Sequence, residues 1–183
     1  MANPVDFTGR PFHFIGVGGI GMSALAYVLA KRKLPVSGSD LRLSHITQRL
    51  QEEGVHIFWS QEASNLDNFQ TVAACNQPLA ATVGVANGQL SLRRGRSLET
   101  QRPTTLPQVV CSTAIRATNP EYRAAQELGC PILHRSDVLA GLIQEYESIA
   151  VAGTHGKTTT SSLISYLLLE ARLDPTIIVG GEV

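Results

Sequence analysis

The sequence carries no net charge and has few charged residues. Its 183 residues hold 15 lysines and arginines against 15 aspartates and glutamates. Nucleic-acid-binding modules normally show a basic surplus, and so do proteins held at a membrane surface by basic segments, so the balance argues against both classes. Charged residues make up 16% of the chain and hydrophobic residues 43%, which argues against global disorder and leaves enough apolar side chains for a buried core.

Cysteine is also scarce. Cys75, Cys111 and Cys130 form no CxxC pair, so neither a zinc knuckle nor a disulfide framework is indicated. The five histidines show no metal-ligand spacing, and no GxSxG nucleophile elbow is present. Sparse thiols fit a reducing compartment, and we therefore expect a cytoplasmic protein.

One stretch resembles a membrane or secretory segment. Residues 11–30 contain no charged side chain, and Lys31, Arg32 and Lys33 follow. Four glycines between residues 16 and 21 would break such a helix and favour a tight turn instead. We expect no membrane contact, while a secreted or membrane protein remains the alternative.

Short β-rich runs alternate with amphipathic helical patterns, which predicts an α/β fold with a parallel sheet covered on both faces. Asn119 is expected to cap a helix that starts at Pro120 and ends at Gly129, and Ser136 to cap one that runs to about Tyr146. The remaining helices are expected at 22–33 and 44–53, and the strands at 12–17, 34–38, 55–59, 109–112 and 132–134.

Two units are expected, with residues 1–147 as the first and 148–183 as the start of the second. In the second we expect a strand at 149–152, a helix at 157–171 and a strand at 176–179. Such a short unit cannot bury enough surface to be a domain of its own. Residues 67–107 interrupt the pattern and are interpreted as a surface insertion, with a basic loop that meets anionic partners as the alternative.

The first motif is the GxGxxG pattern at residues 16–21, between an expected strand and an expected helix. Glycines let the backbone approach a diphosphate, and the helix start offers free amides and a positive dipole end. Asp40 follows the next strand, where it could accept hydrogen bonds from a ribose or cap the following segment. The alternative is a glycine turn needed only for packing. An NAD-binding oxidoreductase is the function that this motif alone suggests.

The second motif is a shortened phosphate-binding loop, again between an expected strand and helix. Lys157 suits the β- and γ-phosphates of a triphosphate, and the Thr158 hydroxyl suits Mg²⁺. The loop amides would form an anion-binding nest, and the ATP-binding candidates are Gly153, Thr154, His155, Gly156, Lys157, Thr158 and Thr159. The alternatives are an ordinary glycine turn and a non-catalytic nucleotide-binding module.

Two further places lie after strands, where ligands of open α/β sheets gather. Ser112 and Thr113 could bind substrate or bond the local backbone. His134 and Arg135 could line a cleft, although a solvated surface pair is the simpler interpretation. With two anion-binding loops, the chain is expected to use a triphosphate to activate something attached to a diphosphate.

The sequence resembles the Mur ligases, in residues 13–23, 36–40, 112–115, 119–121 and 152–160. The resemblance implies a Rossmann-like domain that holds a UDP-sugar, followed by the beginning of an ATPase domain. His155 resembles the alanine-adding member, which implies ATP, Mg²⁺, UDP-N-acetylmuramate and L-alanine as cofactors and substrates, with an acyl phosphate between them. The implied catalytic residues are Lys157 and Thr158, and the implied UDP-sugar contacts are Gly18, Gly19, Ile20, Gly21, Met22, Ser39, Asp40, Ser112 and Thr113.

The sequence ends at Val183, shortly after the second motif. The family's remaining ATP-site residues and its C-terminal domain would follow that point. We therefore expect a fragment that binds the UDP-sugar weakly and does not ligate alanine.

Overall fold

The computed structural model describes residues 5–70 and 106–179. Within these ranges a five-stranded sheet has the order β3-β2-β1-β4-β5, and every neighbouring pair is parallel. The expected α/β fold with a parallel sheet is confirmed. Its strands are β1 (Phe12–Ile15), β2 (Val36–Ser39), β3 (His56–Phe58), β4 (Gln108–Cys111) and β5 (Ile132–His134).

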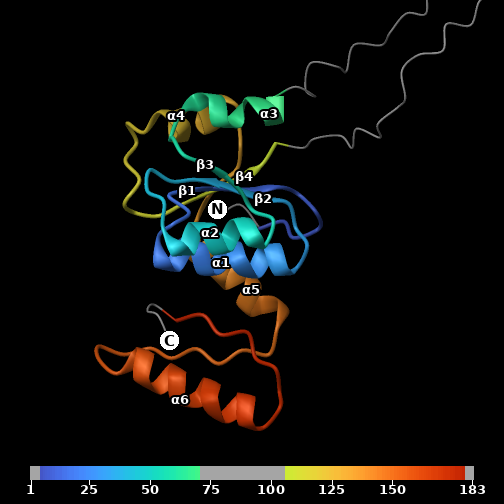
Figure 1. Cartoon of the computed structure of the whole chain (residues 1–183), viewed down its shortest axis with the longest axis vertical. Coiled ribbons are helices and arrows are strands. Elements are labelled where there is room, and N and C mark those ends of the chain that lie inside the picture. Colours follow the sequence, from blue (N-terminus) through green and yellow to red (C-terminus); the bar gives the residue numbers. More distant parts are fainter. Residues whose placement is uncertain (1–4, 71–105, 180–183) are drawn as a thin grey trace, which may run out of the picture.

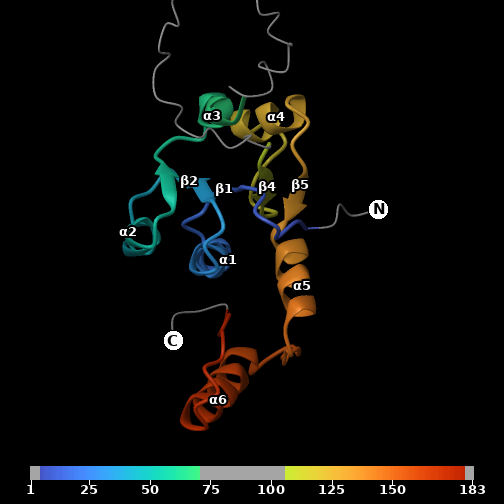
Figure 2. The same ribbon diagram turned by 90° about the vertical axis from the view of Figure 1, so that its right-hand side faces the viewer.

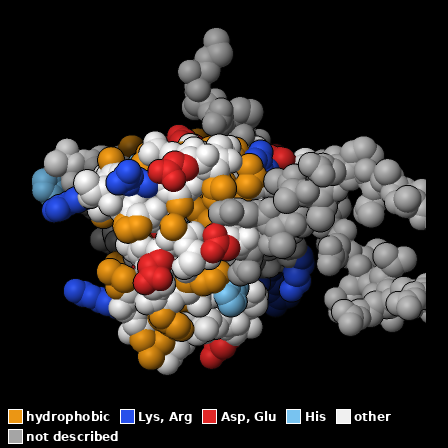
Figure 3. Space-filling model, turned by 90° about the horizontal axis from the view of Figure 1, so that it is seen from above, with side chains coloured by type: hydrophobic (Ala, Val, Ile, Leu, Met, Phe, Trp, Pro, Cys, Tyr) orange, Lys and Arg blue, Asp and Glu red, His pale blue; other side chains and the backbone are white. Residues whose placement is uncertain are grey.

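Helices cover both faces of the sheet (Figures 1 and 2). One layer holds α1 (Ile20–Lys31), α2 (His45–Glu52) and α5 (Arg135–Glu145). The opposite layer holds the 3₁₀ turn η1 (Ala63–Leu66), α3 (Asp67–Gln70) and α4 (Pro120–Glu127). Figure 3 views the α3 and α4 end of the molecule, where basic, acidic and apolar side chains are interspersed rather than gathered by sign.

Alternation along β1 assigns its side chains to the two layers. Phe12 and Phe14 are fully buried in the cluster that includes Leu29 of α1, whereas Ile15 packs in a smaller cluster with Ala125 of α4. Successive strand residues point to opposite faces, so a four-residue strand serves both cores. Each fully buried large apolar side chain stabilises the fold by roughly 1.5–3 kcal/mol.

The helix starts follow side-chain capping chemistry. The Asn119 side chain accepts a hydrogen bond from the Tyr122 amide at 3.0 Å, as predicted, with Pro120 in the first turn. Ser136 is not the cap of α5, so that prediction was wrong. The cap is His134, whose ring accepts from the Ser136 amide at 3.3 Å while the Asp137 carboxylate accepts from the His134 amide at 2.8 Å.

The second unit departs from expectation. Residues 149–152 and 176–179 form no strands, and the regular element of this part is α6 (Lys157–Glu170). A strand requires a neighbour for its backbone groups, and no described residue pairs with these segments. Leu163 and Leu167 are more than 60% exposed, so α6 has no buried face in the described residues. Residues 148–179, the described part of this unit, do not form a P-loop domain.

The expected insertion begins later than predicted, because residues 67–70 are helical and pack against η1. Most of it lies outside the described residues. No helix in the described ranges is both long and apolar enough to cross a bilayer.

Gly38 lies directly beneath the first loop. A Cβ placed there would stand 2.8 Å from Val17 Cβ and 2.9 Å from the Phe14 carbonyl oxygen. We predict that Gly38→Ala lowers the free energy of unfolding by about 1–3 kcal/mol, because backbone must move to admit the methyl group. Urea unfolding measures this. Gly19→Ala is the control, since its nearest neighbour would be 3.5 Å away; equal losses in both variants would contradict the packing argument.

Candidate nucleotide-binding site

The first motif lies where the strand order reverses. From β1 the chain proceeds outward to β2 and β3, whereas β4 and β5 continue on the other side. Crevices at such a switch point, outside the carboxyl ends of the strands, are where open α/β sheets bind ligands. The loop of residues 16–19 after β1 and the segment that starts at Ser112 after β4 both leave the sheet there.

The early amides of this loop are used inside the protein. Gly16 has φ +78° and turns the chain out of β1. The amides of Gly16 and Val17 both donate to the Ser39 carbonyl, at 2.8 and 2.9 Å. The Gly18 amide donates to Asp40 Oδ2 at 2.8 Å. These three donors are therefore not available to a phosphate, and the candidate anion site is narrower than the motif.

The start of α1 remains open. The Gly19 amide makes a long 3.3 Å bond to the Gly16 carbonyl, and no side chain caps the helix. Within the described part of the chain, the amides of Ile20 and Gly21 have no hydrogen-bond acceptor, whereas that of Met22 donates to Gly19 at 2.9 Å. Two unpaired donors at the positive end of a 12-residue helix are the arrangement that binds anions in other proteins, so this helix start is the candidate anion site.

Arg135 reaches this helix start from the other half of the sheet. A Cβ on Gly21 would lie 2.5 Å from Arg135 Nη1, so the guanidinium rests against the glycine. Arg135 is exposed, in line with its interpretation as a solvated surface residue, and its guanidinium also lies against the start of α1. Its signal in the sequence was its position immediately after β5, one strand beyond the switch point.

Asp40 and Ser39 accept hydrogen bonds from the loop and hold its shape. Asp40 accepts from the Gly18 amide through one carboxylate oxygen and from the Arg42 amide, at 3.0 Å, through the other. The Ser39 hydroxyl is fully buried and donates to Glu121 at 2.5 Å, so its side chain does not face the crevice as the sequence suggested. Side chains alternate between the two faces of a strand. Ser39 pairs with Ile15, so its side chain points to the α4 layer as that of Ile15 does.

Ser112 and Thr113, in the segment after β4, were expected to contact the UDP-sugar, but neither side chain is held toward the start of α1 by a hydrogen bond in the described residues. The Ser112 hydroxyl accepts from the Ala114 amide at 3.4 Å, and Thr113 is exposed. Ile115 Cδ1 would be 3.5 Å from a Cβ on Gly16, and the amide nitrogen of Gln61 3.9 Å. Ile115 and Gln61 therefore border the loop, and neither was singled out from the sequence.

The second motif forms an exposed turn before α6. Gly156 precedes the helix with φ +74°, and the Thr160 amide donates to its carbonyl at 2.9 Å. In residues 106–179, the amides of residues 157–159 have no backbone acceptor. The Lys157 amine lies over the turn and donates to the carbonyls of Gly153 and Thr154, at 2.6 and 3.2 Å. His155 and Thr158 are exposed and Thr159 continues the helix.

The described thiols are not poised for nucleophilic chemistry. Burial raises the pKa of Cys111, and the negative charge of Asp137 raises it further. Burial also raises the pKa of Cys130, against a smaller opposing effect of Arg10. Thiolate, the reactive form, is therefore scarce at neutral pH.

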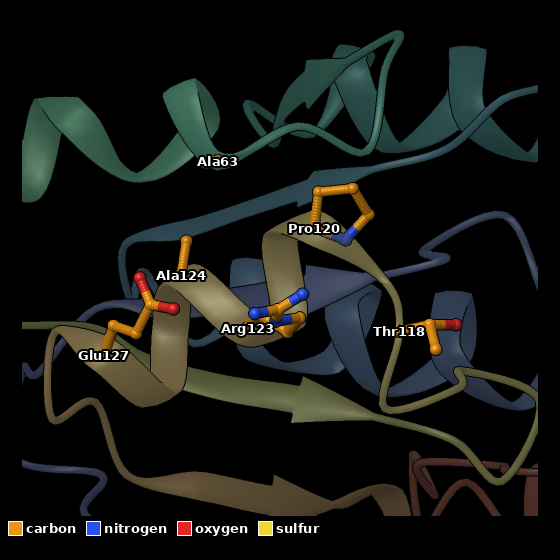
Figure 4. Close-up of a pocket in the computed structure, with 6 residues that line it drawn as sticks. All are labelled: Ala63, Thr118, Pro120, Arg123, Ala124 and Glu127. Carbon is orange, nitrogen blue, oxygen red and sulfur yellow. The ribbon is translucent and has the colours of Figure 1, made fainter.

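An open hollow of about 240 Å³ lies apart from both motifs, between α4 and the start of η1 (Figure 4). In Figure 4 the Arg123 and Glu127 side chains extend from α4. The hollow is lined by none of the site residues that were predicted from the sequence. Its lining is Ala63, Thr118, Pro120, Arg123, Ala124 and Glu127.

Comparison with known families decides the affiliation. The model for the catalytic domain of the Mur ligase family matches residues 11–147, about three quarters of the chain. The chain belongs to the Mur ligase family. The predicted resemblance is thus confirmed, and the match contains the whole sheet and the first motif.

Curated relatives that match the chain carry the name UDP-N-acetylmuramate–L-alanine ligase, and two of them serve as examples. The one from Trichormus variabilis is 66% identical over 183 residues, covering 100% of this chain and 34% of its own length. The one from Trichodesmium erythraeum is 60% identical over 195 residues, covering 100% of this chain and 36% of its own length. The chain thus spans about a third of the relatives that it matches.

Solved structures agree on the fold. The UDP-N-acetylmuramate–alanine ligase of Thermotoga maritima superposes with a TM-score of 0.69 at 27% identity, over 94% of this chain and 32% of that one. A UDP-N-acetylmuramate:L-alanyl-γ-D-glutamyl-meso-diaminopimelate ligase from Neisseria superposes with a TM-score of 0.64 at 22% identity, over 88% of this chain and 40% of its own, and supports the fold alone.

The carboxylate of Asp40 is predicted to hold the loop in shape. Asp40→Ala removes the acceptor of the Gly18 amide and should lower the free energy of unfolding by about 1.5–3 kcal/mol, the usual contribution of a hydrogen bond to a charged group. Chemical denaturation checks this, with the exposed Glu62→Ala as control. If Glu62→Ala lowers the free energy of unfolding as much as Asp40→Ala does, the hydrogen bond between the Gly18 amide and Asp40 makes no specific contribution.

Proposed function

We propose that this chain is the nucleotide-binding N-terminal part of an ATP-dependent ligase that joins L-alanine to UDP-N-acetylmuramate in the cytoplasm. The observation that carries the proposal is a repeated arrangement. At each motif a helix begins with unpaired amides, and a cation lies beside it, Arg135 at α1 and Lys157 at α6. The names of the 60–66% identical relatives supply the substrates.

The diphosphate of the UDP-sugar is proposed to sit over Ile20 and Gly21. Their open amides give two hydrogen bonds, and Arg135 adds the planar fork that suits phosphate oxygens. Gly18, Gly19 and Met22 then shape the floor of the site, with Thr113 and Ser112 across the switch point. Asp40 contributes indirectly through Gly18.

The uridine is proposed to lie on the β2 and β3 side of that diphosphate. Leu41 is 70% exposed after β2, and Trp59 is 46% exposed after β3. The carboxyl ends of neighbouring parallel strands meet at one edge of the sheet, so these side chains offer an apolar surface for a base. We place residues 1–147 in this UDP-sugar domain.

ATP is proposed to bind the turn at residues 153–159, in a second domain that begins near residue 148. The Lys157 amine already lies over the turn, so a short movement from the two carbonyls would bring it to the phosphates. Thr158 has an exposed hydroxyl of the kind that holds Mg²⁺ in phosphate-binding loops. Residues 5–70 and 106–179 contain no cluster of acidic, histidine or cysteine side chains that could hold a metal. The Mg²⁺ contact that we propose is the Thr158 hydroxyl, on the ground of its place in the turn.

The chemistry that we propose is the formation of an amide through an acyl phosphate, and it rests on the family and on the names of the relatives. The muramoyl carboxylate attacks the γ-phosphoryl group of ATP, which gives an acyl phosphate and releases ADP. The amine of L-alanine then attacks the acyl carbon, and phosphate leaves as the amide forms. Mg²⁺, when bound, neutralises part of the phosphate charge. Lys157 acts electrostatically on the transferring phosphoryl group and forms no covalent bond.

Binding of UDP-N-acetylmuramate tests the first site. We predict that the 183-residue chain binds it, and that Arg135→Ala weakens binding about tenfold, as expected for a lost charge-assisted hydrogen bond. Isothermal titration calorimetry measures this, with Arg123→Ala on α4 as the matched control. NAD serves as the competing ligand. Binding of NAD in preference to the sugar nucleotide would replace the proposal with an oxidoreductase.

ATP binding tests the second site. Lys157→Ala should reduce the affinity for Mg-ATP about tenfold or more, because the phosphates lose their nearest cation. Glu170→Ala, at the far end of the same helix, should leave it unchanged. Unaltered ATP affinity in Lys157→Ala would mean that residues 153–159 do not bind the triphosphate in this chain.

A further inference from the structure

A cluster of buried polar side chains lies between the sheet and α4, and the proposed reaction does not use it. Its centre is Glu121, in the first turn of α4, which is fully buried. Every other member is at most 8% exposed, and the cluster draws on β1, β2, η1 and α4. The members are His13, Ser37, Ser39, Asn65 and Glu121.

Glu121 is held by three side chains. One carboxylate oxygen meets His13 Nε2 and Asn65 Nδ2, each at 2.8 Å, and the other accepts from the Ser39 hydroxyl at 2.5 Å. A buried carboxylate is tolerated only when such partners replace its lost water. The cluster is fully connected, because the second ring nitrogen of His13 lies 2.8 Å from the Ser37 hydroxyl.

Ser39 connects this cluster to the first motif. Its hydroxyl is fixed by Glu121, while its carbonyl accepts from the amides of Gly16 and Val17, at 2.8 and 2.9 Å. One residue thus joins the buried carboxylate to the turn that leads into the open amides of α1. No other strand residue in the described ranges bonds both to Glu121 and to that turn.

A second connection starts from the same helix end. Asn119 caps α4 two residues before Glu121, and its side-chain amide donates to Gln61 at 2.8 Å. Gln61 borders Gly16. Asn65, the other donor to Glu121, also donates to the Ser60 carbonyl at 2.7 Å and so holds the residue next to Gln61. The start of α4 therefore supports the loop from two directions.

We infer that Glu121 is a positioning residue for the anion-binding turn after β1. It acts through Ser39 and holds the Gly16 and Val17 amides in their internal bonds, so that the helix start at Ile20 faces the crevice. The ligand part of this inference rests on the proposed function, whereas the effect on the turn does not. An apolar core residue could fill the same volume but could not fix the Ser39 hydroxyl.

The test compares three variants of the 183-residue chain. Glu121→Gln keeps the shape and replaces one carboxylate oxygen by an amide nitrogen, which cannot accept a hydrogen bond, and Ser39→Ala removes only the connecting hydroxyl. Ser37→Ala is the matched control, because it deletes a hydroxyl of the same strand and cluster that touches neither Glu121 nor the turn. Amide hydrogen exchange followed by NMR measures the stability of the hydrogen bonds in the turn, and titration with UDP measures the affinity of the proposed ligand site.

We expect exchange at Gly16 and Val17 to speed up about tenfold in Glu121→Gln and Ser39→Ala, with β4 amides unchanged, and UDP affinity to fall several-fold. Ser37→Ala should leave both readouts within about twofold of the parent chain. If Glu121→Gln does not fold, Ser39→Ala alone decides the result.

Uniform exchange changes across the sheet in all three variants would mean that the cluster is merely structural and would overturn the inference. Unchanged exchange at the turn in Ser39→Ala would overturn it as well. If the parent chain fails to bind UDP, the proposed function is wrong, and the local exchange result still decides whether Glu121 positions the turn.

Discussion

The proposed nucleotide sites depend on the backbone amides at the start of an α-helix that lack a hydrogen-bond acceptor. The first amides of any α-helix have no acceptor within it, so they must be capped, solvated or offered to a ligand. α2, α4 and α5 solve this with the side chains of Ser44, Asn119 and His134. The residues that precede α1 and α6 are glycines, Gly19 and Gly156, and neither helix has a side-chain cap. This contrast within one chain is why we propose the two uncapped helix starts as anion sites.

The same constraint explains why only some amides of the first motif are free to bind a phosphate. Glycines permit the turn, but the turn must still satisfy its own amides, and it does so with the Ser39 carbonyl and the Asp40 carboxylate. The amides left without an internal acceptor, together with Arg135, form the surface that we propose for the phosphate. The six-residue motif thus divides into an internal part, which holds the shape of the turn, and a short outer part, which we propose for the ligand.

Local pattern carried most of the fold prediction. The order of strands and helices in residues 12–58 and 108–146 was predictable because apolar alternation, caps and glycine stops are local signals, and Asn119 followed by Pro120 was predicted correctly, whereas η1 and α3 were not predicted. The strands expected at 149–152 and 176–179 failed because a strand depends on a partner that the pattern does not contain. Ser39 was wrongly predicted to face the crevice, because neighbouring residues of a strand point to opposite faces and the sequence does not show which face is which. Arg135, Gln61 and Ile115 come together only through the sheet order.

Amide chemical shifts of the 183-residue chain, followed by NMR during titration with UDP and then with Mg-ATP, test the central claim most directly. The account predicts that UDP shifts the amides of Ile20 and Gly21, that ATP shifts those of residues 157–159, and that each set responds when the other ligand is already bound. If both ligands perturb the same amides, or if UDP leaves the start of α1 unchanged, two separate nucleotide sites do not exist in this chain.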